Sequence, residues 1–323
     1  TAVAATNQQV GALTTAYGSS GISGLGNETI TVSGGSISAA QADSLIHLTS
    51  NVVTAVIDTA GVSVTTIDTA LQTDGQVNAL SITLDAVDAT LNSAKLANLL
   101  SLDDKTSTTI DAAQITSVTG GYASVLQLYT AGNANTISGL GNEQVEVTGG
   151  LVTLAQADTL ALKTTGVVKA SVSNTALADY AVIAEGVNAY TLTLSDTSVT
   201  AGDLKTLDIK TSGLITATAM SSLTGAYADA YAVLTSEGIS RNSVAESIAV
   251  TVSSSESLDV SQVNALDALS SVGVITAKVS TGTMTGLGGL TTTGTGNAYS
   301  IKVTDVGVDV GALNTLDGKT TVA

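Results

Sequence analysis

Four aspartates lie next to short apolar stretches, where similar segments could align them: Asp85, Asp196, Asp305 and Asp309. Hard cations such as Ca²⁺ bind clustered carboxylate oxygens, so stacked segments could line up a calcium site. Asp also caps helices and forms turns without an ion. Because the Gly-Gly-x-Gly-x-Asp calcium repeat is absent, capping is the favoured interpretation and Ca²⁺ the alternative.

Other residue types with catalytic potential are scarce. His47 is the only histidine and the chain has no Cys, so neither a catalytic triad nor a transition-metal site can be completed. We expect His47 to be a partly buried polar residue. The glycine-rich sequences at 24–26 and 286–289 lack the spacing of a phosphate loop and are expected to be turn glycines. The sequence therefore predicts no catalytic residue, no cofactor and no enzyme.

Five tyrosines fall in segments with helical spacing: Tyr122, Tyr129, Tyr180, Tyr227 and Tyr231. Tyrosine rings can stack on the apolar faces of sugars, so an exposed stripe would indicate a glycan site. The ordinary interpretation of tyrosine at this spacing is the edge of a core, and we expect that here.

Composition limits the kind of core and the possible partners. Apolar residues make up 44% of the chain but aromatic residues only 2%, which favours an aliphatic core of similar packed layers. The net charge of −17 argues against nucleic-acid binding. No run of about 18 apolar residues is present, so no membrane span is expected. The first residues lack an initiator Met and a signal sequence, and we expect a segment of a longer protein.

Two kinds of alternating apolar stretch take turns along the chain. The first kind lies at 30–32, 82–84, 145–147, 192–194, 250–252 and 301–303. The second kind lies at 53–55, 110–112, 168–170, 215–217 and 275–277. Alternation and β-branched residues predict strands at both. The sequence Ile-Ser-Gly-Leu-Gly-Asn-Glu at 22–28 also recurs at 137–143, an offset of 115 residues.

Segments with helical spacing separate these strands. Leucines three residues apart and a closing glycine predict a helix over 201–213, with counterparts at 42–46, 94–100, 262–266 and 312–316. A second type is expected at 226–234 and 177–183, and the glycine-rich stretch 281–297 is expected to be irregular.

The spacing of the strands predicts the fold class. First-kind strands start 52, 63, 47, 58 and 51 residues apart, so a double unit takes about 54 residues and one strand with its helix about 27. We expect an α/β repeat solenoid of right-handed strand-helix coils with a parallel β-sheet, forming a single elongated array of about six double units over 1–323. The alternative is a parallel β-helix-like solenoid with two sheets.

The sequence Leu-Asp-Ile-Lys-Thr-Ser-Gly-Leu-Ile-Thr-Ala at 207–217, with a shorter copy at 316–323, resembles the repeat arrays of giant cell-surface and secreted proteins of marine cyanobacteria. Similar repeats occur in virion fibres of their phages. The resemblance implies an extracellular or cell-surface location, with a virion as the alternative, and carries over no functional residue.

The function expected from repeat and resemblance together is structural. We expect a segment of a surface layer, extracellular filament or fibre shaft that self-associates through its repeat surfaces or ends. The alternative is an adhesive protein whose partner is a glycan or a cell-surface receptor.

Overall fold

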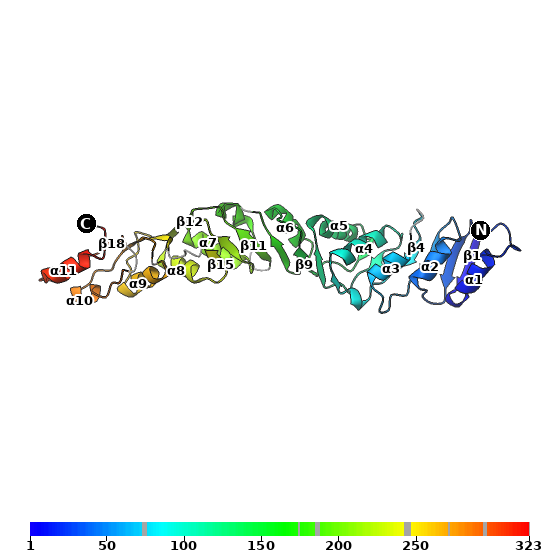
Figure 1. The fold of residues 1–323 in the computed structure, drawn as a ribbon, viewed down its shortest axis with the longest axis horizontal. Coiled ribbons are helices and arrows are strands. Elements are labelled where there is room, and N and C mark those ends of the chain that lie inside the picture. Colours follow the sequence, from blue (N-terminus) through cyan, green and yellow to red (C-terminus); the bar gives the residue numbers. More distant parts are fainter. Residues whose placement is uncertain are drawn as a thin grey trace. The chain divides into compact units, whose positions relative to one another are not determined.

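The computed structural model describes residues 1–72, 76–173, 175–184, 188–241, 247–270, 272–292 and 296–322. The chain divides into two compact units, Thr1–Ala170 and Ser171–Ala323. Figure 1 gives the order of helices and strands along the chain. Each unit is described by itself.

The first unit contains parallel strands in three sheets. One sheet has the order β1 (Ala2–Thr6), β2 (Thr29–Ser33), β3 (Val53–Val56) and β4 (Ala79–Ser81). A second holds β5 (Thr90–Leu91), β7 (Ser117–Gly120), β9 (Gln144–Val147) and β10 (Val168–Ser171), and a third pairs β6 (Ile110–Asp111) with β8 (Ile137–Ser138). Each described strand thus pairs in parallel with one that comes shortly before or after it in the sequence.

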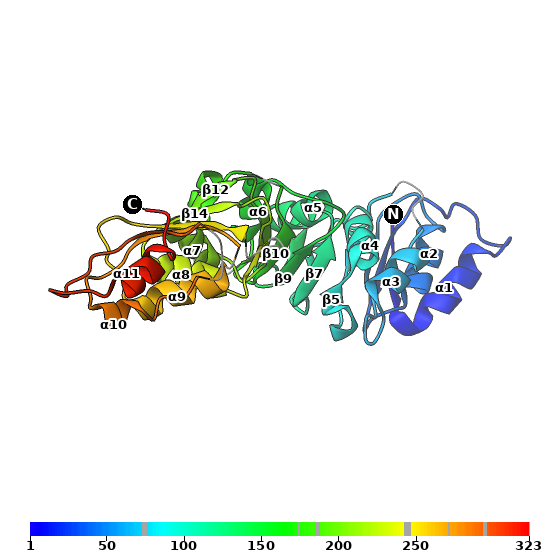
Figure 2. The same cartoon turned by 60° about the vertical axis from the view of Figure 1, so that its left-hand side comes forward.

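Helices connect these strands. The α-helices are α1 (Val10–Tyr17), α2 (Ala39–Ile46), α3 (Val64–Ala70), α4 (Ser93–Asp103), α5 (Tyr122–Asn133) and α6 (Leu154–Ala161), and the 3-10 helices are η1 (Asn7–Gln9) and η2 (Ala86–Asp88). Each α-helix contacts the next one in the sequence. Figure 2 shows α1, α2 and α3 side by side in that order.

In the second unit, the described strands form two parallel sheets. The first holds β11 (Ala189–Thr193), β13 (Ile215–Ala217) and β15 (Ile239–Arg241). The second has the order β12 (Ser198–Thr200), β14 (Ser222–Gly225), β16 (Ala249–Val252), β17 (Ile275–Lys278) and β18 (Ala298–Ser300). The helices are η3 (Leu177–Val182), α7 (Ala201–Lys210), α8 (Tyr227–Thr235), α9 (Val260–Leu269), α10 (Met284–Leu287) and α11 (Val310–Asp317).

Register between neighbouring strands places like residues opposite each other. Ile30 pairs with Val53, and Leu192 pairs with Ile215, each 23 residues further along the chain. All four side chains are 0% exposed. Because alternate residues of a strand point to opposite faces, one row of each sheet enters an aliphatic core and the next row faces outward. Leu204 and Leu207 of α7 are buried as predicted from their spacing.

The structure confirms an α/β fold with parallel sheets. Each unit contains more than one sheet, which departs from the favoured prediction of one sheet but was allowed by its alternative with two. Two predicted strands are also displaced. The run at 82–84 lies beyond β4, with Thr83 making only an isolated bridge to Asp111, and the run at 301–303 lies beyond β18. In both places the burial alternation starts earlier, at Leu80 and Tyr299.

One helix prediction is confirmed and one needs correction. Within the segment 177–183, predicted to be helical, Leu177–Val182 forms the 3-10 helix η3. The stretch 281–297, predicted to be irregular, contains the short helix α10, and its residues 293–295 lie outside the described residues.

Candidate functional site

Several threonine and serine hydroxyls that come just after a helix form hydrogen bonds to backbone groups in or next to a strand before that helix. The Thr211 hydroxyl accepts the Tyr190 backbone N–H at 2.9 Å and donates to the Tyr190 carbonyl at 2.9 Å. Thr106 contacts Leu80 in the same two ways, at 2.9 and 2.8 Å. Each hydroxyl therefore takes part in the backbone hydrogen bonding of an earlier strand. The strand residue lies 21 residues before Thr211 and 26 residues before Thr106.

The same position is used elsewhere among the described residues. Thr320 makes both bonds to Tyr299. Three further hydroxyls donate to a backbone carbonyl of an earlier segment, Thr49 to Glu28, Thr164 to Glu143, and Ser270 to Ile248. Thr49, Thr106, Thr164, Thr211 and Ser270 are all buried. Buried backbone groups need partners, so these hydroxyls stabilise the contact between successive strand-helix segments. We call them the bridging hydroxyls.

A lysine precedes the bridging hydroxyl at several of these positions. Lys105 Nζ donates to the carbonyls of Asp68 and Leu71 at 2.8 and 2.7 Å, at the end of α3. Lys210 Nζ donates to the Ala181 carbonyl at 2.7 Å in η3, and Lys319 Nζ donates to Gly288 and Leu290 beyond α10. Unpaired carbonyls and the helix dipole make a helix C-terminus favourable for a cation. The Lys-Thr pair thus joins two successive segments twice, through the helix and through the strand.

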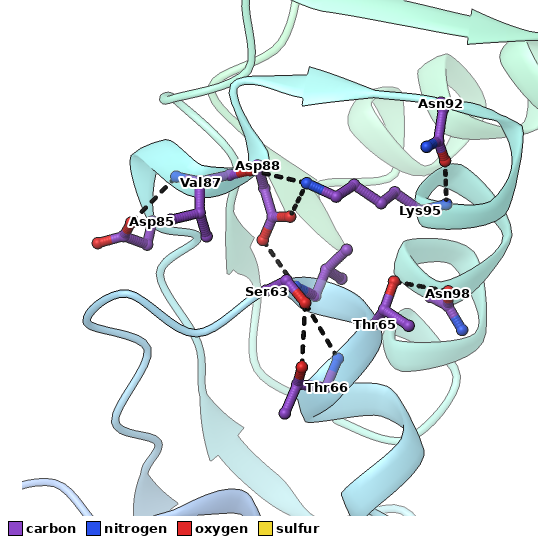
Figure 3. Close-up of polar contacts among 10 residues, drawn as sticks. Ser63, Thr65, Thr66, Asp85, Val87, Asp88, Asn92, Lys95 and Asn98 are labelled. Carbon is purple, nitrogen blue, oxygen red and sulfur yellow. Dashed lines mark hydrogen bonds and ion pairs between the residues drawn. The ribbon is translucent and has the colours of Figure 1, made fainter.

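Carboxylates make the corresponding contact at helix N-termini. Asp88 Oδ2 accepts the backbone N–H of Val64, the first residue of α3, at 2.7 Å, and Asp88 Oδ1 lies 3.0 Å from Lys95 Nζ (Figure 3). Glu256 accepts the Tyr227 N–H at the start of α8 at 2.8 Å. Anions stabilise helix N-termini, which carry partial positive charge. Both carboxylates come from a later segment of the chain. Asp88 lies 24 residues after Val64, and Glu256 lies 29 residues after Tyr227.

The four aspartates predicted from the sequence all accept helix-terminal N–H groups. Asp85 and Asp309 cap their own helices, η2 and α11, at 3.0 and 2.9 Å, and Figure 3 includes Asp85 with Val87. Asp196 accepts from Leu177 at 2.6 Å, and Asp305 accepts from Met284 at 2.5 Å.

The capping interpretation is therefore confirmed. Within the part of the chain that the structure describes, no three His, Asp or Glu side chains gather as a metal site would require. Calcium binding at the four aspartates stays a prediction.

The remaining sequence candidates have structural positions. His47 is the C-cap of α2, with Nδ1 2.8 Å from the Asp43 carbonyl oxygen, and its side chain is 49% exposed. The expectation of a partly buried histidine is wrong, because the helix ends at the surface there. Gly24 and Gly26 have φ of 85° and 114°, as turn glycines do, whereas Gly286 lies inside α10.

The duplicated Gly-Leu-Gly-Asn-Glu sequence forms the same carboxylate environment twice. Glu28 accepts the Gly26 N–H at 2.7 Å and the Tyr17 hydroxyl at 3.1 Å. Glu143 accepts the Gly141 N–H at 2.9 Å and the Tyr129 hydroxyl at 2.9 Å. The Gly26 N–H lowers the pKa of Glu28, and burial together with Glu143 raises the pKa of Tyr129.

The tyrosines divide into two groups. Tyr129 and Tyr180 are buried, as expected for a core edge. Tyr122 and Tyr227 are half-buried and Tyr231 is 40% exposed, with the Tyr227 and Tyr231 ring centroids 5.9 Å apart. Only this second group presents ring surface to solvent.

Comparison with known proteins adds no relative. No family model, no curated protein and no solved structure matches the chain. Among the described helices, none has the length and apolar character needed to cross a bilayer. The fold and contacts define a parallel α/β protein in which several buried polar side chains, such as Thr211 and Asp88, bond to a neighbouring segment.

Proposed function

We propose that the chain is a structural repeat segment of an extracellular assembly, such as a surface layer, filament or fibre shaft, and that its strand-helix segments form right-handed solenoid coils. In this proposal it has no catalytic role and requires no cofactor. Its partners are other copies of the repeat surface. A cell-surface location is preferred to a virion on the resemblance of its sequence repeats.

The bridging hydroxyls carry the proposal. Thr106 in the first unit and Thr211 in the second bond to the preceding strand in the same way, although the two segments differ in length. A contact that always joins one segment to its neighbour is what a stack of similar units requires. Parallel strand-helix-strand connections are right-handed in about 98% of cases, which supports the right-handed form of the proposal.

The surface chemistry is also consistent with a structural role. Net charge is −17, and charged residues are 11% of the chain. Exposed strand positions are occupied mainly by Thr and Ser, as at Thr31, Thr54 and Thr251. Such a surface is uncharged enough for lateral packing yet remains hydrated, which suits an assembled extracellular protein.

Deletion of one period tests the solenoid. Residues 145–167 span the 23 positions between the paired residues Val145 and Val168. Their removal should let Val168 take the place of Val145 beside β7, with a cooperative unfolding transition retained. Removal of residues 145–156 alone, about half a period, should abolish that transition. If both deletions unfold the chain equally, the solenoid proposal is wrong.

Electron microscopy tests the assembly. Negative-stain images of the purified chain should show ordered fibres or sheets at high protein concentration. Images with and without added Ca²⁺ test the four aspartates at the same time, since dependence on Ca²⁺ would make them ligands. Isolated molecules under both conditions would contradict self-association by this segment.

A further inference from the structure

Four threonines form a row across the larger sheet of the second unit. Thr200 pairs with Thr224, Thr224 with Thr251, and Thr251 with Thr276, on strands β12, β14, β16 and β17. Ala298 of β18 continues the row. Thr200, Thr251 and Thr276 are exposed and Thr224 is half-buried, while their neighbours Val199, Leu223, Val250 and Ile275 are in the core. Hydroxyl and methyl groups therefore repeat along the outer face at about 4.8 Å, the strand spacing.

This row lies in a groove of about 890 Å³. Small residues keep the groove open at one side, among them Gly202, Gly225 and Ala226, and Ser253 and Ser254 add hydroxyls. Five strands contribute to it, so it spans about 19 Å, four strand spacings. A groove of that length suits an extended chain better than a compact small molecule.

A pocket of about 460 Å³ adjoins the groove, and Thr200 and Asp203 line both. Its apolar wall comes from Leu177 of η3, Val199 of β12 and Leu207 of α7. Its polar groups include Asp196 and Lys210. An apolar wall facing carboxylate and hydroxyl acceptors matches a sugar ring, which has an apolar face and hydroxyls around its edge.

We propose that the groove and pocket together bind an extended, uncharged polysaccharide strand, with one sugar in the pocket and successive sugars along the threonine row. This site goes beyond the proposed structural role and would attach the assembly to a glycan. The site is lined by Asp196, Asp203 and Asp229 together with Lys210 and Lys278. Asp229 is paired with Lys205 at 2.7 Å, and Lys210 Nζ donates to the Ala181 carbonyl. The net charge of the whole chain, −17, disfavours acidic glycans and nucleic acids.

An extended peptide fits the groove less well. Peptides that bind sheets add a strand to an exposed edge through main-chain hydrogen bonds. The central strands under the groove, β14, β16 and β17, are each paired on both sides. Recognition must therefore use side-chain hydroxyls and carboxylates, which are groups that hydrogen-bond to sugar hydroxyls.

Titration calorimetry on the full chain tests the site. The probes are hexasaccharides of β-1,4-linked glucose, β-1,4-linked N-acetylglucosamine and α-1,4-linked glucose, the corresponding monosaccharides, and an oligouronate of six residues. At least one neutral hexasaccharide should bind ten times more tightly than its monosaccharide and than the oligouronate. No binding of any neutral hexasaccharide at millimolar concentration, or a preference for the oligouronate, would overturn the proposal.

Matched variants locate the binding. Thr251→Arg places a bulky side chain in the middle of the groove and should weaken hexasaccharide binding at least tenfold. Thr54→Arg makes the same change at an exposed threonine of β3 in the first unit and should change binding less than twofold. Circular dichroism and thermal melts confirm that both variants fold. Equal weakening by the two variants, or none by Thr251→Arg, would show that the groove is not the site.

Discussion

The Thr211 hydroxyl bonds to both backbone groups of Tyr190, accepting its N–H and donating to its carbonyl, each at 2.9 Å. Tyr190 is 0% and Thr211 is 6% exposed, so water has little access to either backbone group. A side chain 21 residues later thus supplies part of the bonding of β11.

Replacing Thr211 by valine should therefore destabilise the second unit. The shape is nearly kept, but the Tyr190 N–H and carbonyl lose their hydrogen bonds to the Thr211 hydroxyl, at a cost of about 1–3 kcal/mol in the free energy of unfolding. Urea unfolding followed by circular dichroism measures it. Thr206→Val is the control, because the Thr206 hydroxyl is exposed and, among the described residues, bonds to the Gly202 carbonyl of its own helix and to no other segment. If the two variants lost the same free energy of unfolding, the bridging hydroxyl of Thr211 would contribute no more to stability than an ordinary helix hydroxyl.

The Lys105–Asp68 ion pair should matter much more than Lys169–Glu146. Both pairs have N–O distances of 2.7 Å, but their side chains are 14% and 10% exposed in the first pair and 62% and 45% in the second. Lys105→Met leaves the Asp68 carboxylate without its cation in a nearly buried site, which costs about 3–5 kcal/mol. Lys169→Met should cost at most about 1 kcal/mol. Chemical denaturation of the two variants compares them, and similar losses would contradict the argument.

The first unit should lose stability at alkaline pH because of Tyr129. Burial and the Glu143 carboxylate raise the pKa of Tyr129 above its ordinary value of 10.0. A phenol whose pKa is raised on folding holds its proton more tightly in the native state, so its contribution is full below pH 10 and is lost as the pH rises above 10.

Unfolding free energies measured between pH 8 and pH 11 check this expectation, and about 10 is where the decline should begin. Tyr129→Phe removes the titrating group and should flatten the decline. It should also lower stability at pH 7, because Glu143 loses the hydroxyl that donates to it at 2.9 Å. If the unfolding free energy of the variant declined with pH as steeply as before, the loss of stability at alkaline pH would come from groups other than Tyr129.

Two glycines with similar positive φ angles should tolerate alanine differently. Gly139 and Gly149 have φ of 82° and 87°, so alanine costs about 1–2 kcal/mol at either for the left-handed conformation. At Gly139 the added Cβ would also lie 2.6 Å from the Ala113 nitrogen, whereas at Gly149 nothing lies within 4 Å. Melting temperatures should therefore fall further for Gly139→Ala. The reverse order would mean that Ala113 can move freely.

Much of the local structure was predictable because it depends on near neighbours. Alternation at 30–32 and at 192–194 predicted strands, and leucines at 204 and 207 predicted a buried helix face. Where prediction failed, as at 82–84, the apolar alternation runs past the end of the strand. Hydrogen bonding to a neighbouring strand decides where a strand ends, and the alternation of apolar residues contains no information on that bonding.

The roles of the Lys-Thr pairs were not predictable, although the pairs are visible in the sequence at 105–106, 210–211 and 319–320. A spacing rule within one segment cannot reveal that Lys105 reaches a helix end 34 residues earlier. Recurrence of the pair directly after a helix was the available signal, and it could have suggested a contact between segments.

The sequence by itself determined an aliphatic α/β chain of short strands and helices, because periodicity, propensity and composition act over a few residues. Tertiary structure decided how many sheets form, which carboxylate caps which helix, and where a row of threonines faces a groove. Those features depend on contacts between residues about 20 to 30 positions apart, whose partners are chosen by packing and by the need to satisfy buried polar groups.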